Sequence, residues 1–183
     1  MLNSRHPSTN WQVKTQPYKG VRNTVKHMRQ LAGKAQSHPR VREAALRVVR
    51  EVSPKDFLSE LAAIYYDTCR RFRYIRDPAE AEMIHHPAVL LERGAGDCDD
   101  MALYLQAALR ALAEVGSLSL SVGNDSEYVV VGFDPQATGD GRFSHVFLRA
   151  NAGSGQWLVL DPVAGPYTGD MLSRIAHFQT FGG

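Results

Sequence analysis

Residues 96–112 read GDCDDMALYLQAALRAL, a stretch that predicts a helix beginning at a cysteine. Gly96 interrupts the chain just upstream, and Asp97 suits the N-cap of a helix. The residues that follow are strong helix formers, and their apolar members fall on one stripe: Met101, Leu105, Ala108, Leu109 and Leu112. The Cys98 thiol is therefore expected where unpaired N–H groups and the positive end of the helix dipole converge. This environment favours the thiolate that a cysteine nucleophile requires.

Two observations weigh against a reactive Cys98. Cysteine is among the most buried residue types, so a purely structural role is the first alternative. Asp97, Asp99 and Asp100 also place three carboxylates beside the thiol, and negative charge raises a thiol pKa. Their effect is smaller if they cap the helix or pair with Arg93.

Two downstream stretches supply a histidine and an aspartate in predicted strands. Residues 143–148 read FSHVFL, an alternation that puts His145 on one face with two phenylalanines. Residues 156–161 read QWLVLD and end with Asp161 directly before a proline. The turn-forming sequence NAGSG at 151–155 joins the two strands in a predicted hairpin, which can bring His145 and Asp161 side by side.

Cys98, His145 and Asp161 then correspond to a nucleophile, a general base and a carboxylate that orients the imidazole. At these residues the chain resembles the transglutaminase-like superfamily of cysteine enzymes. The resemblance spans about residues 55–165 and rests on these segments: Phe72 to Pro78 (FRYIRDP), Gly96-Asp97-Cys98, Ser144-His145-Val146 and Leu160-Asp161-Pro162.

The resemblance implies an α+β fold with a papain-like core, in which N-terminal helices and the nucleophile-bearing helix pack on an antiparallel β-sheet. It also implies a catalytic triad of Cys98, His145 and Asp161. Small members of this kind are often encoded by bacteriophages. An oxyanion hole requires hydrogen-bond donors, for which we expect the Cys98 backbone N–H and consider the Tyr74 hydroxyl.

The composition argues against several other classes of protein. A chain of 183 residues with 44% apolar content can bury one core. Cys69, which we expect in the core of a helix, and Cys98 give no disulfide framework and no paired-cysteine metal site. We find no apolar leader and no membrane-spanning stretch, so we expect cytoplasmic residence, with incorporation in a phage particle as an extension.

His85 and His86 raise the question of a metal site, since Asp97 and Asp99 follow closely. Adjacent histidines in a strand or loop point apart, and no helix-spaced pair supports them. We therefore expect two loop residues near the cleft, and neither a metal nor a cofactor.

Charge divides the chain. Residues 1–50 hold 11 Lys and Arg against one acidic residue, whereas the remaining 133 residues hold 10 basic and 18 acidic residues. We therefore predict a basic N-terminal arm with helices over 1–50 and a transglutaminase-like catalytic domain over 51–183. The basic part is either a solvated surface or a docking surface for an acidic protein or for phage assembly. It lacks a nucleic-acid-binding motif.

The remaining elements are predicted from periodicity and turn residues. The predicted helices cover 21–35, 41–52 and 56–73, with a loop from there to the cysteine. The further strands cover 117–122 and 128–133, and a short closing helix with a tail covers 167–183.

Two function classes remain open. The first is a cysteine enzyme of acyl-transfer type, in which Cys98 attacks a peptide or amide carbonyl and water or an amine resolves the thioester. Hydrolysis is favoured, because no acceptor-amine site is recognisable in the sequence. The second is a structural or adaptor protein of a phage particle that keeps the fold and binds through residues 1–50.

Overall fold

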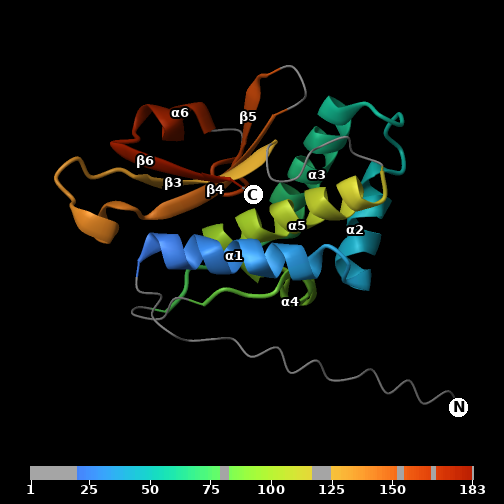
Figure 1. The fold of residues 1–183 in the computed structure, drawn as a ribbon, viewed down its shortest axis with the longest axis horizontal. Coiled ribbons are helices and arrows are strands. Elements are labelled where there is room, and N and C mark those ends of the chain that lie inside the picture. The colour runs from blue at the N-terminus through green and yellow to red at the C-terminus, as the bar shows by residue number, and fades with distance from the viewer. Residues whose placement is uncertain (1–19, 79–82, 117–124, 152–154, 166–167, 183) are drawn as a thin grey trace, which may run out of the picture.

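The computed structural model describes residues 20–78, 83–116, 125–151, 155–165 and 168–182. Helices from the N-terminal half pack on one face of an antiparallel sheet from the C-terminal half (Figure 1). This arrangement confirms the predicted α+β class. None of the helices in these ranges is both long and apolar enough to cross a membrane.

Helix α5 (Cys98–Glu114) runs through the centre of the molecule (Figure 1). Between Asp99 and Leu112 every residue except Arg110 is buried, so the buried surface extends well beyond the predicted stripe. Five elements pack against α5: α1 (Val21–Ala35), α2 (Pro39–Val49), α3 (Phe57–Arg71), α4 (Pro87–Arg93) and strand β4 (His145–Asn151). The start of α5 is thereby fixed against the sheet.

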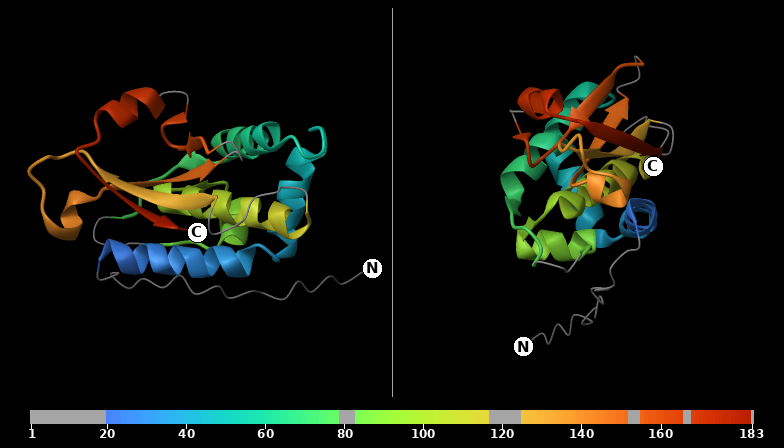
Figure 2. Two further views of the ribbon diagram at one scale, coloured as in Figure 1. Left: turned by 45° about the horizontal axis from the view of Figure 1, so that its top comes forward. Right: turned by 90° about the vertical axis from the view of Figure 1, so that its left-hand side faces the viewer.

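The four-stranded sheet has the order β5-β4-β3-β6, with antiparallel pairing throughout. The other three strands are β3 (Ser126–Gly132), β5 (Trp157–Leu160) and β6 (His177–Gly182). Alternation divides the side chains between two faces. Tyr128, Val130 and Leu148 join the core around α5. Val129, Val131 and Phe147 form a second cluster on the face that α6 (Thr168–Ser173) covers (Figure 2).

The structure contains short elements that were not predicted from the sequence. The segment predicted as a loop before the cysteine contains α4, which begins with a proline at its first position, where the missing N–H costs nothing. It also contains β2 (Ala95–Gly96), which pairs in parallel with β1 (Arg73–Tyr74). The predicted tail contains the edge strand β6 in addition to a short helix. The strand predicted at 117–122 lies outside the described residues.

The basic helices α1 and α2 belong to the same hydrophobic core as α5. Val25, Met28 and Val41 are at most 1% exposed and contact that cluster. The exposed side of α2 is also tied to α4, where Arg40 and Glu92 form an ion pair of 3.1 Å. The domain division at residue 50 stays a prediction.

Candidate active site

His145 and Asp161 are joined by a hydrogen bond of 2.6 Å between Nε2 and Oδ2. His145 is the first residue of β4, and Asp161 directly follows β5. The two strands pair with Leu160 opposite Leu148, so the chain after β5 continues along β4 toward His145. The predicted hairpin and the predicted histidine–aspartate contact are therefore present.

Asp161 is completely buried and held by the turn that follows it. Its Oδ1 accepts hydrogen bonds from the N–H groups of Val163, at 3.0 Å, and Ala164, at 3.1 Å. Its Oδ2 is thereby directed at the imidazole, which also lies near the rings of Phe133 and Phe147. One further contact could not be predicted from any local pattern: the Tyr65 hydroxyl donates to the Asp161 carbonyl oxygen.

Cys98 is the first residue of α5 and is half-buried. The predicted N-cap is confirmed, because the Asp97 side chain accepts a hydrogen bond from the Asp100 N–H. The thiol also accepts a hydrogen bond from the backbone N–H of Val146, the residue next to His145. No hydrogen bond joins Cys98 to His145 in the described residues, so their direct approach stays a prediction.

Burial raises the pKa of the Cys98 thiol well above its ordinary value, and the charges of Asp99 and Asp97 raise it further. The Val146 hydrogen bond lowers the pKa but does not offset these effects. The resting thiol is therefore protonated. Burial and the two adjacent carboxylates therefore oppose the thiolate that the helix start was expected to favour.

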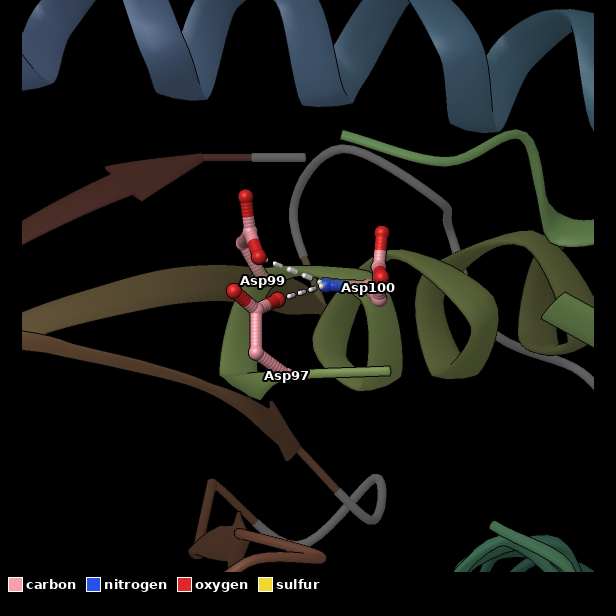
Figure 3. Close-up of side chains that lie close together, drawn as sticks. All are labelled: Asp97, Asp99 and Asp100. Atoms are coloured by element: carbon pink, nitrogen blue, oxygen red, sulfur yellow. Dashed lines mark hydrogen bonds between the residues drawn. The ribbon is translucent and has the colours of Figure 1, made fainter. Parts of the chain in front are cut away.

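Three carboxylates surround the start of α5 (Figure 3), and oxygen atoms of Asp97, Asp99 and Asp100 lie within 4.8 Å of one another. Oxygens of Asp97 and Asp99 accept the Asp100 N–H, at 3.5 and 3.0 Å. Both oxygens of Asp100 bind His85, one through the backbone N–H at 2.7 Å and one through Nδ1 at 2.8 Å. Hydrogen bonds at the helix start and to His85 thus explain why these three carboxylates lie close together.

His85 and His86 lie in the loop before α4, as predicted, and both are buried. His85 Nε2 contacts the Arg93 guanidinium, so Arg93 reaches the aspartates through His85 and not directly. His86 caps α4, with Nδ1 accepting the Ala88 N–H at 3.2 Å. The two histidines therefore hold the segment that leads to Cys98.

Tyr74 lies within electrostatic range of the proposed nucleophile. Burial raises the pKa of Tyr74, and negative charge on an ionised Cys98 and on Asp97 raises it further. The backbone next to it is tied to the cysteine loop, because the Ile75 N–H donates to the Gly96 carbonyl oxygen at 2.9 Å. The role of Tyr74 as an oxyanion donor stays a prediction.

No protein-family model and no curated protein matches the sequence. Among solved structures, the chain is similar to a proposed protease from Parabacteroides distasonis, with a TM-score of 0.56 and 14% identity over 79% of this chain and 27% of that chain. It is also similar to a proposed cysteine protease from Cytophaga hutchinsonii, with a TM-score of 0.49 and 17% identity over 94% of this chain and 56% of that chain. The chain thus spans well under two thirds of either structure, and the first similarity supports the fold.

Proposed function

We propose that this protein is a cysteine enzyme of the transglutaminase-like type that hydrolyses a peptide or amide bond through a thioester. The observation that carries the proposal is the 2.6 Å hydrogen bond between His145 and a fully buried Asp161, next to a strand residue that binds the Cys98 thiol. A carboxylate in this position fixes one tautomer of the imidazole and stabilises its charged form.

The proposed reaction uses the two nitrogens of His145 differently. Asp161 engages Nε2, so Nδ1 is the nitrogen that takes the proton of Cys98. The sulfur then forms a bond to the substrate carbonyl carbon, and the carbonyl oxygen becomes an oxyanion. When this intermediate collapses, the bond to the leaving amine breaks and the imidazolium returns the proton to that amine.

The thioester is then attacked by water, from which His145 removes a proton, and the acid product leaves as Cys98 regains its proton. We assign the oxyanion to the Cys98 backbone N–H, because the first N–H groups of a helix have no partner within the helix. Tyr74 is our candidate for the second donor, since its hydroxyl lies in the electrostatic range of Cys98. An amine in place of water would give transamidation by the same steps.

A Cys98→Ala variant tests this proposal. The change deletes one sulfur atom at a helix start, so we expect the free energy of unfolding to change by no more than about 1–2 kcal/mol. Incubation with a peptide library, read by mass spectrometry, should show cleavage by the wild type and none by Cys98→Ala. Under acid quench, the wild type should also carry an acyl adduct on Cys98.

The control is Cys69→Ser, which removes the other thiol but keeps a hydrogen-bonding group beside Tyr65, and it should retain cleavage. Cleavage by Cys98→Ala at the wild-type rate would refute the proposed nucleophile.

One observation favours the second candidate, an adaptor protein that keeps the fold. The pKa of Cys98 is raised by burial and by two carboxylates, as in a thiol that is never required to ionise. On this alternative Cys98→Ala is silent in every assay, and loss of residues 1–20 abolishes binding to an acidic partner.

A further inference from the structure

Tyr65 reaches the candidate active site from helix α3. Its hydroxyl lies 3.1 Å from the carbonyl oxygen of Asp161 and 3.2 Å from the carbonyl oxygen of Gly165. These two carbonyls belong to the first and last residues of the turn after β5, which the Gly165 N–H closes by donating to Asp161 at 2.9 Å. The one hydroxyl proton is shared between these two carbonyl oxygens, so a single side chain contacts both ends of this turn.

The same turn sets the direction of the Asp161 carboxylate. Its amides, from Val163 and Ala164, bind Oδ1, and this leaves Oδ2 for His145. A displacement of the turn therefore moves the carboxylate relative to the imidazole. Catalytic groups must be held within about 0.5 Å of their productive positions, so such a displacement affects proton transfer.

The orientation of the Tyr65 hydroxyl is itself restricted. Cys69 lies one helical turn further along α3, and its thiol forms a hydrogen bond with Tyr65. The tyrosine is half-buried. Its hydroxyl contacts Cys69 on its own helix and the turn after β5 on the side of the sheet.

We propose that Tyr65 is a positioning residue, whose hydroxyl fixes the turn at 161–165 and so holds Asp161 against His145. The inference rests on the proposed function, because it concerns the geometry of the proposed triad. Tyr65 does not contact the reacting atoms and acts only through Asp161.

The test is Tyr65→Phe, with Tyr66→Phe as the matched control. Tyr66 is the next residue of α3 and its side chain is 59% exposed. In Tyr65→Phe we expect kcat to fall about fivefold to tenfold with KM unchanged, the effect of one lost hydrogen bond on the barrier. Tyr66→Phe should keep both constants.

A second readout requires no substrate. The proton on Nε2 of His145 gives an NMR resonance that reports its hydrogen bond to Asp161. We expect this resonance to shift or broaden in Tyr65→Phe and to stay in place in Tyr66→Phe.

The outcomes separate the two proposals. If Cys98→Ala still cleaves, the proposed function fails and this inference fails with it. If Cys98→Ala is inactive while Tyr65→Phe keeps the wild-type kcat and the wild-type resonance, only the positioning role is overturned. A fall in activity that merely follows the fraction of unfolded Tyr65→Phe protein would also overturn it, because the role would then be structural.

Discussion

At the scale of single residues, the candidate site combines a histidine that is held in place by Asp161 with a cysteine thiol that is not activated at rest. The carboxylate and the carbonyl oxygen of Asp161 both accept hydrogen bonds, so the folded protein already holds the His145 imidazole in one orientation. Cys98, in contrast, is disfavoured as a thiolate by burial and by Asp99 and Asp97. In the proposed mechanism, His145 must therefore remove this proton once the substrate is bound.

The effect of the neighbouring carboxylates on the thiol gives a prediction. Because the charge of Asp99 raises the pKa of Cys98, Asp99→Asn should lower that pKa and move the alkylation profile to lower pH. The asparagine keeps an oxygen for the Asp100 N–H, so the helix start is preserved. We expect iodoacetamide to modify Cys98 several-fold faster at pH 8, measured by peptide mapping that separates Cys98 from Cys69.

The control for this prediction is Glu114→Gln, at the opposite end of α5. It removes the same charge far from the thiol and should leave the profile unchanged. An unchanged profile in Asp99→Asn would show that burial alone sets the reactivity of Cys98.

At the scale of elements, helix α4 depends on a buried neutral histidine. The His86 ring caps the helix and packs edge-on against His38, the N-cap of α2, at 5.4 Å between ring centroids. Burial lowers the pKa of His86 to about 4, and the charges of His38 and Lys34 contribute. Protonation would both charge a buried ring and remove the acceptor for the Ala88 N–H.

The fold should therefore lose stability in acid. A histidine with a depressed pKa contributes its full stability above pH 6.5 and loses it as the pH falls toward 4. The shift of about 2.5 pKa units corresponds to about 3 kcal/mol. His86→Asn keeps an N-capping acceptor and should flatten this part of the stability curve, measured by urea unfolding between pH 4 and 7.5. The control His177→Asn, on the edge strand β6, should keep the wild-type slope. Parallel curves for the wild type and His86→Asn would contradict the prediction.

The elements that the sequence predicted are those whose signals are local. The helix predicted at 21–35 coincides with α1, and the strands predicted at 128–133 and 143–148 overlap β3 and β4. Helix α4 has only seven residues, too few for a periodic pattern, and its proline favoured a loop interpretation. Strand β6 was missed because it is fixed by pairing with β3, more than forty residues earlier in the chain.

In the candidate site, too, only the contact between neighbouring elements could be predicted from the sequence. The contact between His145 and Asp161 could be predicted, because a short hairpin places one strand beside the next. The contacts of Tyr65 with Asp161, and of His85 with Asp100, join separate elements across the core. No local pattern encodes such contacts, and they arise only when the helices pack on the sheet.

At the scale of the whole molecule, the sharp division of charge does not coincide with a division of the core. The basic helices α1 and α2 present Arg22, Lys26 and Arg47 on the outside and bury their apolar faces on α5. Figure 2 shows α1 lying alongside α5 over most of its length. Cys98 is the first residue of α5, so the basic helices α1 and α2 pack against the helix that positions the candidate nucleophile.

Truncation distinguishes a supporting layer from an independent arm. Deletion of residues 1–49 removes Val25, Met28 and Val41 from the core, and full burial of each such side chain is worth roughly 1.5–3 kcal/mol. It also exposes the apolar face of α5 against which they pack. The combined loss approaches the whole stability of a typical domain, about 5–15 kcal/mol, so residues 50–183 should not melt cooperatively in circular dichroism. Deletion of residues 1–19, the matched truncation, leaves every buried side chain of α1 and α2 in place and should keep both the thermal transition and the reactivity of Cys98. A cooperative transition of the 50–183 fragment near the wild-type temperature would instead support two separately folding units with their boundary at residue 50.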